Sequence, residues 1–227
     1  MIILKEKQSL IYLILTIVML LLLIIGASFA YIMTSVTNTA TTAIAVEAAG
    51  TDVLTTSSSA NISINITNAN MVSTAASSAN ATDSTLKDDG TLTVSYTAAD
   101  TSGSRCSYNL VLTRTSSAVY TASSFYTSNK STYPFEFSIQ VTAGTWRGTG
   151  SAKNLAQTNI SALTWSSNKA TLISGADIRS NSTSVISQSW TVLIRAYNLP
   201  GNQDSLAGLN WSGTVGVENV QCGLSYS

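Results

Sequence analysis

The residues of this chain with the clearest chemistry are its two cysteines, Cys106 and Cys222. In an oxidising compartment such a pair can form one disulfide bond, and the alternative is two buried free thiols. The chain has no histidine, which removes Ser-His-Asp and Cys-His catalytic arrangements, the HExxH zinc motif and histidine acid–base chemistry. Two cysteines alone cannot form a four-ligand zinc site. We therefore predict a disulfide, no catalytic or metal-binding residue, no cofactor, and a protein that is not an enzyme.

Three aspartates and one tryptophan are weaker candidates for a site. Asp83, Asp88 and Asp89 could supply oxygen ligands to calcium, but their spacing does not match an EF-hand loop and a lysine lies among them. The favoured interpretation is a solvated turn over residues 87–90. Trp146 lies near two glycines in a predicted loop, where it is the one tryptophan expected to be exposed enough to stack on a sugar. Packing is the commoner role of such a side chain.

The charge of the chain argues against nucleic acid as a partner. Lys and Arg number 11, as do Asp and Glu, so the net charge is zero, and only 10% of the residues are charged. Binding to nucleic acid needs clustered Lys and Arg. The chain beyond its N-terminal apolar run is instead rich in Ser, Thr, Asn, Ala and Val, a composition typical of a neutral, β-rich extracellular domain.

Alternation of apolar and polar residues predicts the strands that position these candidates. The predicted core-facing sets lie within 62–66, 92–96, 106–112, 135–141 and 190–196. In the fourth set Glu136 is expected to face water. A last strand, over 211–222, changes parity, which indicates either a bulge near Asn219 or the end of the strand. Short strands between polar turns predict an all-β fold, an antiparallel β-sandwich that is jelly-roll-like, over residues 47–227, preceded by one N-terminal hydrophobic helix.

The N-terminal apolar run bears on where the protein is located. Residues Leu10 to Ile32 carry no charge and follow Lys5 and Lys7. About 20 apolar residues span a bilayer, and positive charge before the run predicts that the N-terminus stays inside while the rest is exported. Residues 1–30 are therefore a signal peptide or a membrane anchor, and the rest is expected to be extracellular or at the cell surface.

The end of the run resembles a cleavage site. Ser28 and Ala30 place small residues at the −3 and −1 positions that a signal peptidase requires, so cleavage before Tyr31 is the favoured interpretation. The length of the run favours the alternative, a retained anchor that holds the protein in the membrane.

Residues 31–46 are predicted to be extended, because they are uncharged, rich in β-branched residues and free of proline. Val36, Ile44 and Val46 could fill pockets on an acceptor sheet, so the segment is a candidate donor strand. The alternatives are a spacer, or pairing within its own domain.

Several stretches carry a resemblance to a known family. Gly26–Tyr31, Thr42–Val46, Trp190–Leu199 and Leu209–Val220 resemble the leader and closing strands of the TasA/camelysin family of exported bacterial surface and biofilm-matrix proteins. Leaders of that family end in an aromatic-Ala-Tyr-aromatic pattern and are cut before the tyrosine by a dedicated signal peptidase; here Ile32 stands in place of the second aromatic residue. The resemblance implies a jelly-roll sandwich, secreted by a Gram-positive-type bacterium, that assembles into extracellular fibres. The metalloprotease activity described for camelysins is not carried over, because the chain lacks histidine and a zinc motif.

The leading functional hypothesis is an exported structural surface or biofilm-matrix protein that polymerises by strand exchange. The alternative is a membrane-anchored monomeric adhesin or carbohydrate-binding module. A minor pilin is a weaker interpretation, because the chain lacks the Phe-Thr-Leu-Ile-Glu type of processing site. The expected partners are the membrane, through the N-terminal helix before cleavage, a signal peptidase, and further copies of the chain.

Overall fold

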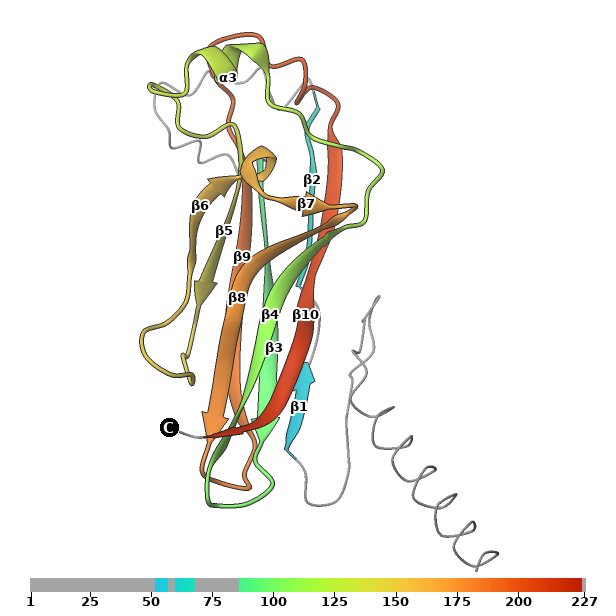
Figure 1. Cartoon of the computed structure of the whole chain (residues 1–227). Helices are drawn as coiled ribbons and strands as arrows, with labels where there is room; N and C mark the ends of the chain where they lie inside the picture. The colour runs from blue at the N-terminus through green and yellow to red at the C-terminus, as the bar shows by residue number, and fades with distance from the viewer. Residues whose placement is uncertain (1–51, 57–59, 68–85, 226–227) are drawn as a thin grey trace, which may run out of the picture. The chain divides into compact units, whose positions relative to one another are not determined.

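The structure is a computed structural model that describes residues 52–56, 60–67 and 86–225 (Figure 1). All of them belong to one compact unit, Thr37–Ser227. The predicted N-terminal hydrophobic helix, the leader 1–30 and the segment 31–46 lie outside the described residues.

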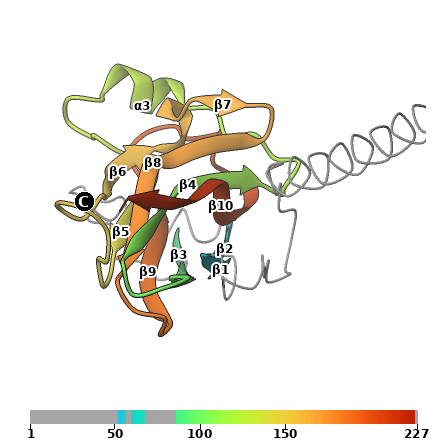
Figure 2. The ribbon, with the colours of Figure 1, turned by 60° about the horizontal axis from the view of Figure 1, so that its bottom comes forward.

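Two five-stranded antiparallel sheets make up the described domain. The first sheet has the order β1-β3-β9-β5-β6 and the second the order β2-β10-β4-β8-β7. Viewed nearer to the strand direction, β3, β5 and β9 form one layer and β4, β8 and β10 the other (Figure 2). The strands are β1 (Val53–Thr56), β2 (Ala60–Asn65), β3 (Lys87–Thr97), β4 (Ser104–Arg114), β5 (Phe137–Ala143), β6 (Leu155–Asn159), β7 (Trp165–Ser166), β8 (Lys169–Ser180), β9 (Ile186–Ala196) and β10 (Asn210–Ser225). This confirms the predicted all-β antiparallel sandwich.

Helix is scarce in the described part of the chain, where it comprises α3 (Ser124–Ser128) and the 3-10 turn η2 (Ile160–Ala162). Within those residues, no helix has the length and apolar character needed to cross a membrane.

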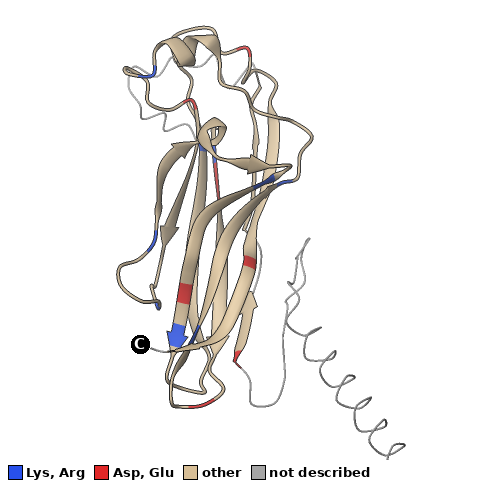
Figure 3. Cartoon of the chain, in the orientation of Figure 1, with Lys and Arg blue, Asp and Glu red and all other residues tan. Residues whose placement is uncertain are grey.

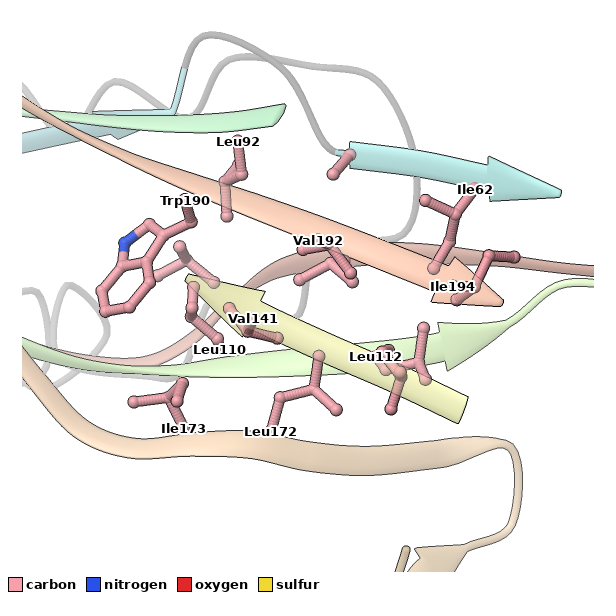
Figure 4. Packing of buried hydrophobic residues seen from close by; sticks show 14 of the residues in the cluster. Ile62, Leu92, Leu110, Leu112, Val141, Leu172, Ile173, Trp190, Val192 and Ile194 are labelled. Carbon is pink, nitrogen blue, oxygen red and sulfur yellow. The ribbon is translucent and has the colours of Figure 1, made fainter. Parts of the chain in front are cut away.

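The core lies between the sheets and is built from the predicted alternating sets. Side chains of β3, β5 and β9 meet those of β2, β4 and β8 across the gap (Figure 4). Each large apolar side chain removed from water in this way stabilises the fold by about 1.5–3 kcal/mol. The predicted residues that are buried are Ile62, Ile64, Ile66, Leu92, Val94, Tyr96, Cys106, Tyr108, Leu110, Leu112, Phe137, Ile139, Val141, Trp190, Val192, Ile194 and Ala196.

The predicted turn over residues 87–90 is wrong, because these residues begin β3. They continue its ladder with β9, from Lys87 opposite Arg195 to Gly90 opposite Val192. Gly90 suits this position because a Cβ there would lie only 3.0 Å from the Cβ of Ala60 in β2. The two sheets approach each other closely at this border.

Alternation did not reveal β8, one of the longest strands. Its adjacent residues Leu172 and Ile173 are both buried, and Gly175 has φ of 58°. The register with β4 slips at Leu110. These irregularities break the two-residue period from which a strand is recognised in a sequence.

Candidate functional site

The two cysteines form the predicted disulfide bond. Cys106 in β4 and Cys222 in β10 are bonded, with their Cα atoms 4.0 Å apart and a sequence separation of 116. Cys106 is fully buried, whereas Cys222 is half-buried at the border of the core. The bond therefore ties the end of the last strand to a central strand of the same sheet.

The first half of β10 is held on both sides. Over Asn210–Val215 it pairs with all of β2, and over Gly213–Glu218 it pairs with β4. Trp211, Val215 and Val217 point into the core, where the Trp211 ring packs edge-on against Phe137 at 5.5 Å.

A bulge separates this half from the rest of β10, which is one of the two arrangements that the change of parity indicated. Asn219 has φ of 54°, and the register with β4 shifts between Glu218 and Gln221 and again before Leu224. An extra residue on one strand increases the local twist and turns the strand away from its earlier plane. Beyond the bulge none of residues 219–225 is buried, and Val220 is 45% exposed.

One side of β10 has no strand partner over residues 216–224 within the described ranges; we call this the open edge. β2 ends opposite Val215, and β1 pairs with β3 in the first sheet instead. At about 3.4 Å per residue the open edge is roughly 30 Å long. Glu218 is its only charged residue, it contains no lysine or proline, and charged side chains are sparse over the sandwich (Figure 3). It therefore has no lysine or proline to protect it from added strands, and its protective features are one glutamate and the bulge at Asn219.

The chain enters the described domain beside the open edge. Asp52 Oδ1 accepts hydrogen bonds from the Ala99 N–H (2.9 Å) and the Ser104 hydroxyl (2.6 Å). A Cβ placed on Gly223 would lie 3.8 Å from Asp52 Oδ2. The Tyr96 hydroxyl is hydrogen-bonded to Ser104, and burial raises the pKa of Tyr96 to about 12. These contacts fix Asp52, the first described residue, beside the open edge.

The opposite border of the sandwich is covered by residues 144–154, which we call the edge loop. The Arg147 N–H donates to Gln188 Oε1 of the first sheet (3.0 Å), and the Arg147 carbonyl accepts from the Arg179 N–H of the second (3.1 Å). The Thr149 N–H donates to Asp177 Oδ2 (3.0 Å). The loop therefore bridges both sheets, and it bonds to the β8 backbone where β7 no longer covers that strand.

Trp146 belongs to this loop and has the packing role favoured by the sequence analysis, not that of an exposed sugar platform. Its ring packs edge-on against Trp190 at 5.9 Å, and its Nε1 donates to the Gly150 carbonyl (3.1 Å). The side chain is half-buried against the core. It closes the gap between the sheets at this border, which is a packing role.

A buried carboxylate at the end of the sandwich near α3 was not predicted. Glu136 was expected to face water, but it is 0% exposed. Its carboxylate accepts from the Tyr120 hydroxyl (2.6 Å), the Ser123 N–H (2.9 Å), the Ser123 hydroxyl and Gln203 Nε2 (3.0 Å). Neither of the two ion pairs in the described part of the chain involves it. Hydrogen bonds therefore take the place of a cation.

The Glu136 contacts join segments that are distant in sequence. Ser123 also caps α3, because its hydroxyl accepts from the Tyr126 N–H (3.1 Å), and Gln203 accepts from the Leu199 N–H (2.6 Å). Burial, and then the Glu136 carboxylate, raise the pKa of Tyr120, so its hydroxyl keeps the proton that it donates. The cluster therefore has a structural role, because it holds the segments of Tyr120, Ser123 and Gln203 to Glu136. Alternation could not reveal it, since the segments that cover Glu136 lie elsewhere in the chain.

The predicted calcium ligands do not come together in the described residues. Asp88 lies in β3 and accepts from the Ser63 N–H (2.7 Å), Asp89 is exposed on the same strand, and Asp83 lies outside the described residues. No group of three or more His, Cys, Asp or Glu side chains placed to hold a metal occurs in the parts that the structure describes.

The predicted residues of the N-terminal region all lie outside the described residues. They are the cleavage-site residues Ser28, Ala30 and Tyr31 and the donor-strand residues Val36, Ile44 and Val46. These assignments stay predictions.

Comparison with known proteins adds no relative, since no family model, curated protein or solved structure matches the chain significantly.

Proposed function

We propose that this chain is an exported structural protein of the bacterial surface or biofilm matrix, and that it polymerises by strand exchange. Residues 31–46 of one copy add to the open edge, 216–224, of the next. Residues 1–30 direct export, with cleavage between Ala30 and Tyr31. Membership of the TasA/camelysin family, implied by the leader and the closing strands, is part of this proposal.

The connectivity of the strands supports a jelly-roll domain. Without β1 and β7, the sheets have the orders β2-β10-β4-β8 and β3-β9-β5-β6. Most successive strands cross from one sheet to the other, and the last strand lies beside the first of its own sheet. This arrangement is that of a double Greek key, in which neighbours in a sheet come from opposite ends of the chain.

The open edge is the observation that carries the proposal. No described strand bonds to its outward-facing backbone N–H and C=O groups, and main-chain bonds of this kind supply the affinity in strand addition. The candidate donor is uncharged and free of proline, so it can continue a ladder without repulsion or interruption. Asp52 lies near Gly223, and the donor precedes it by only a few residues of chain.

Pairing between copies gives fibres rather than closed dimers. The donor and the acceptor are different surfaces, so the contact is head-to-tail and each copy still offers one free surface. At the opposite border the edge loop bonds to the exposed side of β8. That loop therefore hinders a strand from adding to β8.

The donor is tested by removing it. Deleting residues 31–41 is expected to leave a folded, soluble monomer, whereas the intact exported protein forms fibres visible by electron microscopy. If the deletion variant still forms fibres, the donor assignment is wrong. If the intact protein stays monomeric at high concentration, the anchored adhesin or carbohydrate-binding module becomes the better description.

The acceptor is tested by a matched pair of substitutions. Val220→Lys places a charge on the open edge, while Val185→Lys makes the same change at a valine that is 67% exposed in the connection before β9. Val220→Lys is expected to raise the concentration needed for fibre formation about tenfold or more, the equivalent of about 1.4 kcal/mol, and Val185→Lys to leave it unchanged. Equal effects of the two would contradict the assignment of the edge.

A further inference from the structure

The residues beyond the bulge of β10 are fastened to the domain in an unusual way. Residues 219–225 bury no side chain, so the hydrophobic effect contributes little to holding them. In the ladder with β4, Gln221 lies opposite Ser107, Leu224 opposite Arg105 and Ser225 opposite Ser104. Arg105 Nε also donates to the Ser225 carbonyl (3.0 Å).

The disulfide bond is the strong element in this fastening. Cys222 lies within the second register shift, between Gln221 and Leu224, where the ladder is irregular and a strand separates easily. A ladder at the end of a sheet, with little buried apolar surface, opens locally at low free energy. A covalent bond to buried Cys106 prevents that opening.

We propose that the Cys106–Cys222 bond is a redox latch on the open edge. In the oxidised chain, residues 219–224 stay in the sheet and form an acceptor for an added strand. In the reduced chain they separate from β4, and only residues 216–218 of the acceptor remain anchored. This inference rests on the proposed function, because it gives that function a control: the chain becomes competent to accept a strand once its thiols are oxidised.

The order of the thiol–disulfide exchange steps follows from the different exposure of the two cysteines. A dithiol reductant attacks the Cys222 sulfur, because Cys106 is fully buried. A mixed disulfide with Cys222 forms, and Cys106 leaves as a thiolate that takes up a proton. The second thiol of the reductant then displaces Cys222, so the reductant becomes a disulfide as both cysteines become thiols. Oxidation by a disulfide reverses these steps.

The structural part of the latch is tested by hydrogen exchange on the full chain, oxidised and then reduced with a dithiol. Reduction is expected to speed exchange of the amides of residues 219–224 by about tenfold or more, under conditions in which the domain stays folded. The amides of β5 are expected to stay much better protected than those of residues 219–224, although loss of the bond lowers the stability of the whole fold. A Cys222→Ser variant should show the same pattern without reductant. Unchanged exchange in 219–224 overturns the latch. Exchange of the β5 amides as fast as that of residues 219–224 also overturns it, because the bond would then hold the whole fold.

The functional part is tested by assembly of the same samples. Fibres are expected from the oxidised chain, none from the reduced chain, and fibres again after reoxidation. Fibres from the reduced chain overturn control by the latch even if residues 219–224 are released. If the oxidised chain forms no fibres, the proposed function and the control both fail, while the exchange measurement still decides whether the segment is released.

Discussion

The two halves of β10 belong to one strand but are stabilised by different means. Residues 210–217 pair with β4 and β2 and bury Trp211, Val215 and Val217. Residues 219–225 pair with β4 alone, bury no side chain and depend on a disulfide bond. The comparison shows that a continuous strand can be part of the core at one end and an open template at the other. The change occurs at a single bulge, at Asn219.

Removing the disulfide has the largest expected effect on stability. The bond closes a loop of more than a hundred residues, and in the chain-entropy model a loop of that size is worth roughly 4–5 kcal/mol. Replacing both cysteines by alanine should lower the free energy of unfolding by that order, measured by urea denaturation. A loss below about 1 kcal/mol would show that the second half of β10 does not need the bond.

Truncating one apolar side chain in each half tests the difference in burial. Trp211→Ala should cost about 3–5 kcal/mol, because it leaves a cavity beside Phe137. Leu224→Ala, in the half-buried second half, should cost less than about 1 kcal/mol. Both values come from chemical denaturation of the oxidised protein. Similar losses for the two variants would contradict the comparison.

Two glycines in the first half of β10 test how tightly each face of the strand is packed. Gly213 lies on the buried face with Trp211 and Val215, and Gly216 on the opposite face. A Cβ on Gly213 would lie 2.8 Å from the Trp211 ring and 2.9 Å from a Leu112 methyl, whereas a Cβ on Gly216 would meet nothing within 4 Å. Gly213→Ala should therefore destabilise by about 1–3 kcal/mol, and Gly216→Ala by no more than about 0.5 kcal/mol. Thermal unfolding of the pair would show whether close packing is confined to the core-facing side of this half.

Alkaline pH should weaken the contacts among Tyr96, Ser104 and Asp52, beside the second half of β10. Burial raises the pKa of Tyr96 to about 12 from its ordinary 10.0, so the folded chain keeps a proton that the unfolded chain gives up. Its contribution to stability is therefore complete below pH 10 and is lost as the pH rises through about 12. Tyr96→Phe should make the free energy of unfolding fall less steeply over that range. An unchanged slope would show that Tyr96 does not titrate there.

The sheets could be predicted from the sequence wherever one face of a strand is apolar. The sets around Leu92, Leu110 and Trp190 alternate cleanly because each strand has one face in the core and one in water. β8 escaped prediction because its bulged, doubly buried residues do not alternate, and the start of β3 was taken for a turn because its residues are polar.

The candidate site could be predicted only in part. The cysteine pair and the bulge at Asn219 were indicated by residue type and parity, and both are confirmed. Glu136 could not be placed, because its burial depends on Tyr120, Ser123 and Gln203, which come from other segments. The packing partner of Trp146 could not be predicted either, because Trp190 comes from a distant strand.

The sequence by itself determined that this is a neutral chain without histidine, and it predicted an all-β fold of alternating strands with one disulfide bond. These properties follow from composition and from the two-residue period of a strand, which are local. Only the tertiary structure decided which edge is covered and which is open. β2 ends at Ala60, opposite Val215, while the edge loop crosses to β8. An edge is defined by the strands that are absent beside it, and pairing between residues distant in sequence is settled only when the whole sheet is assembled.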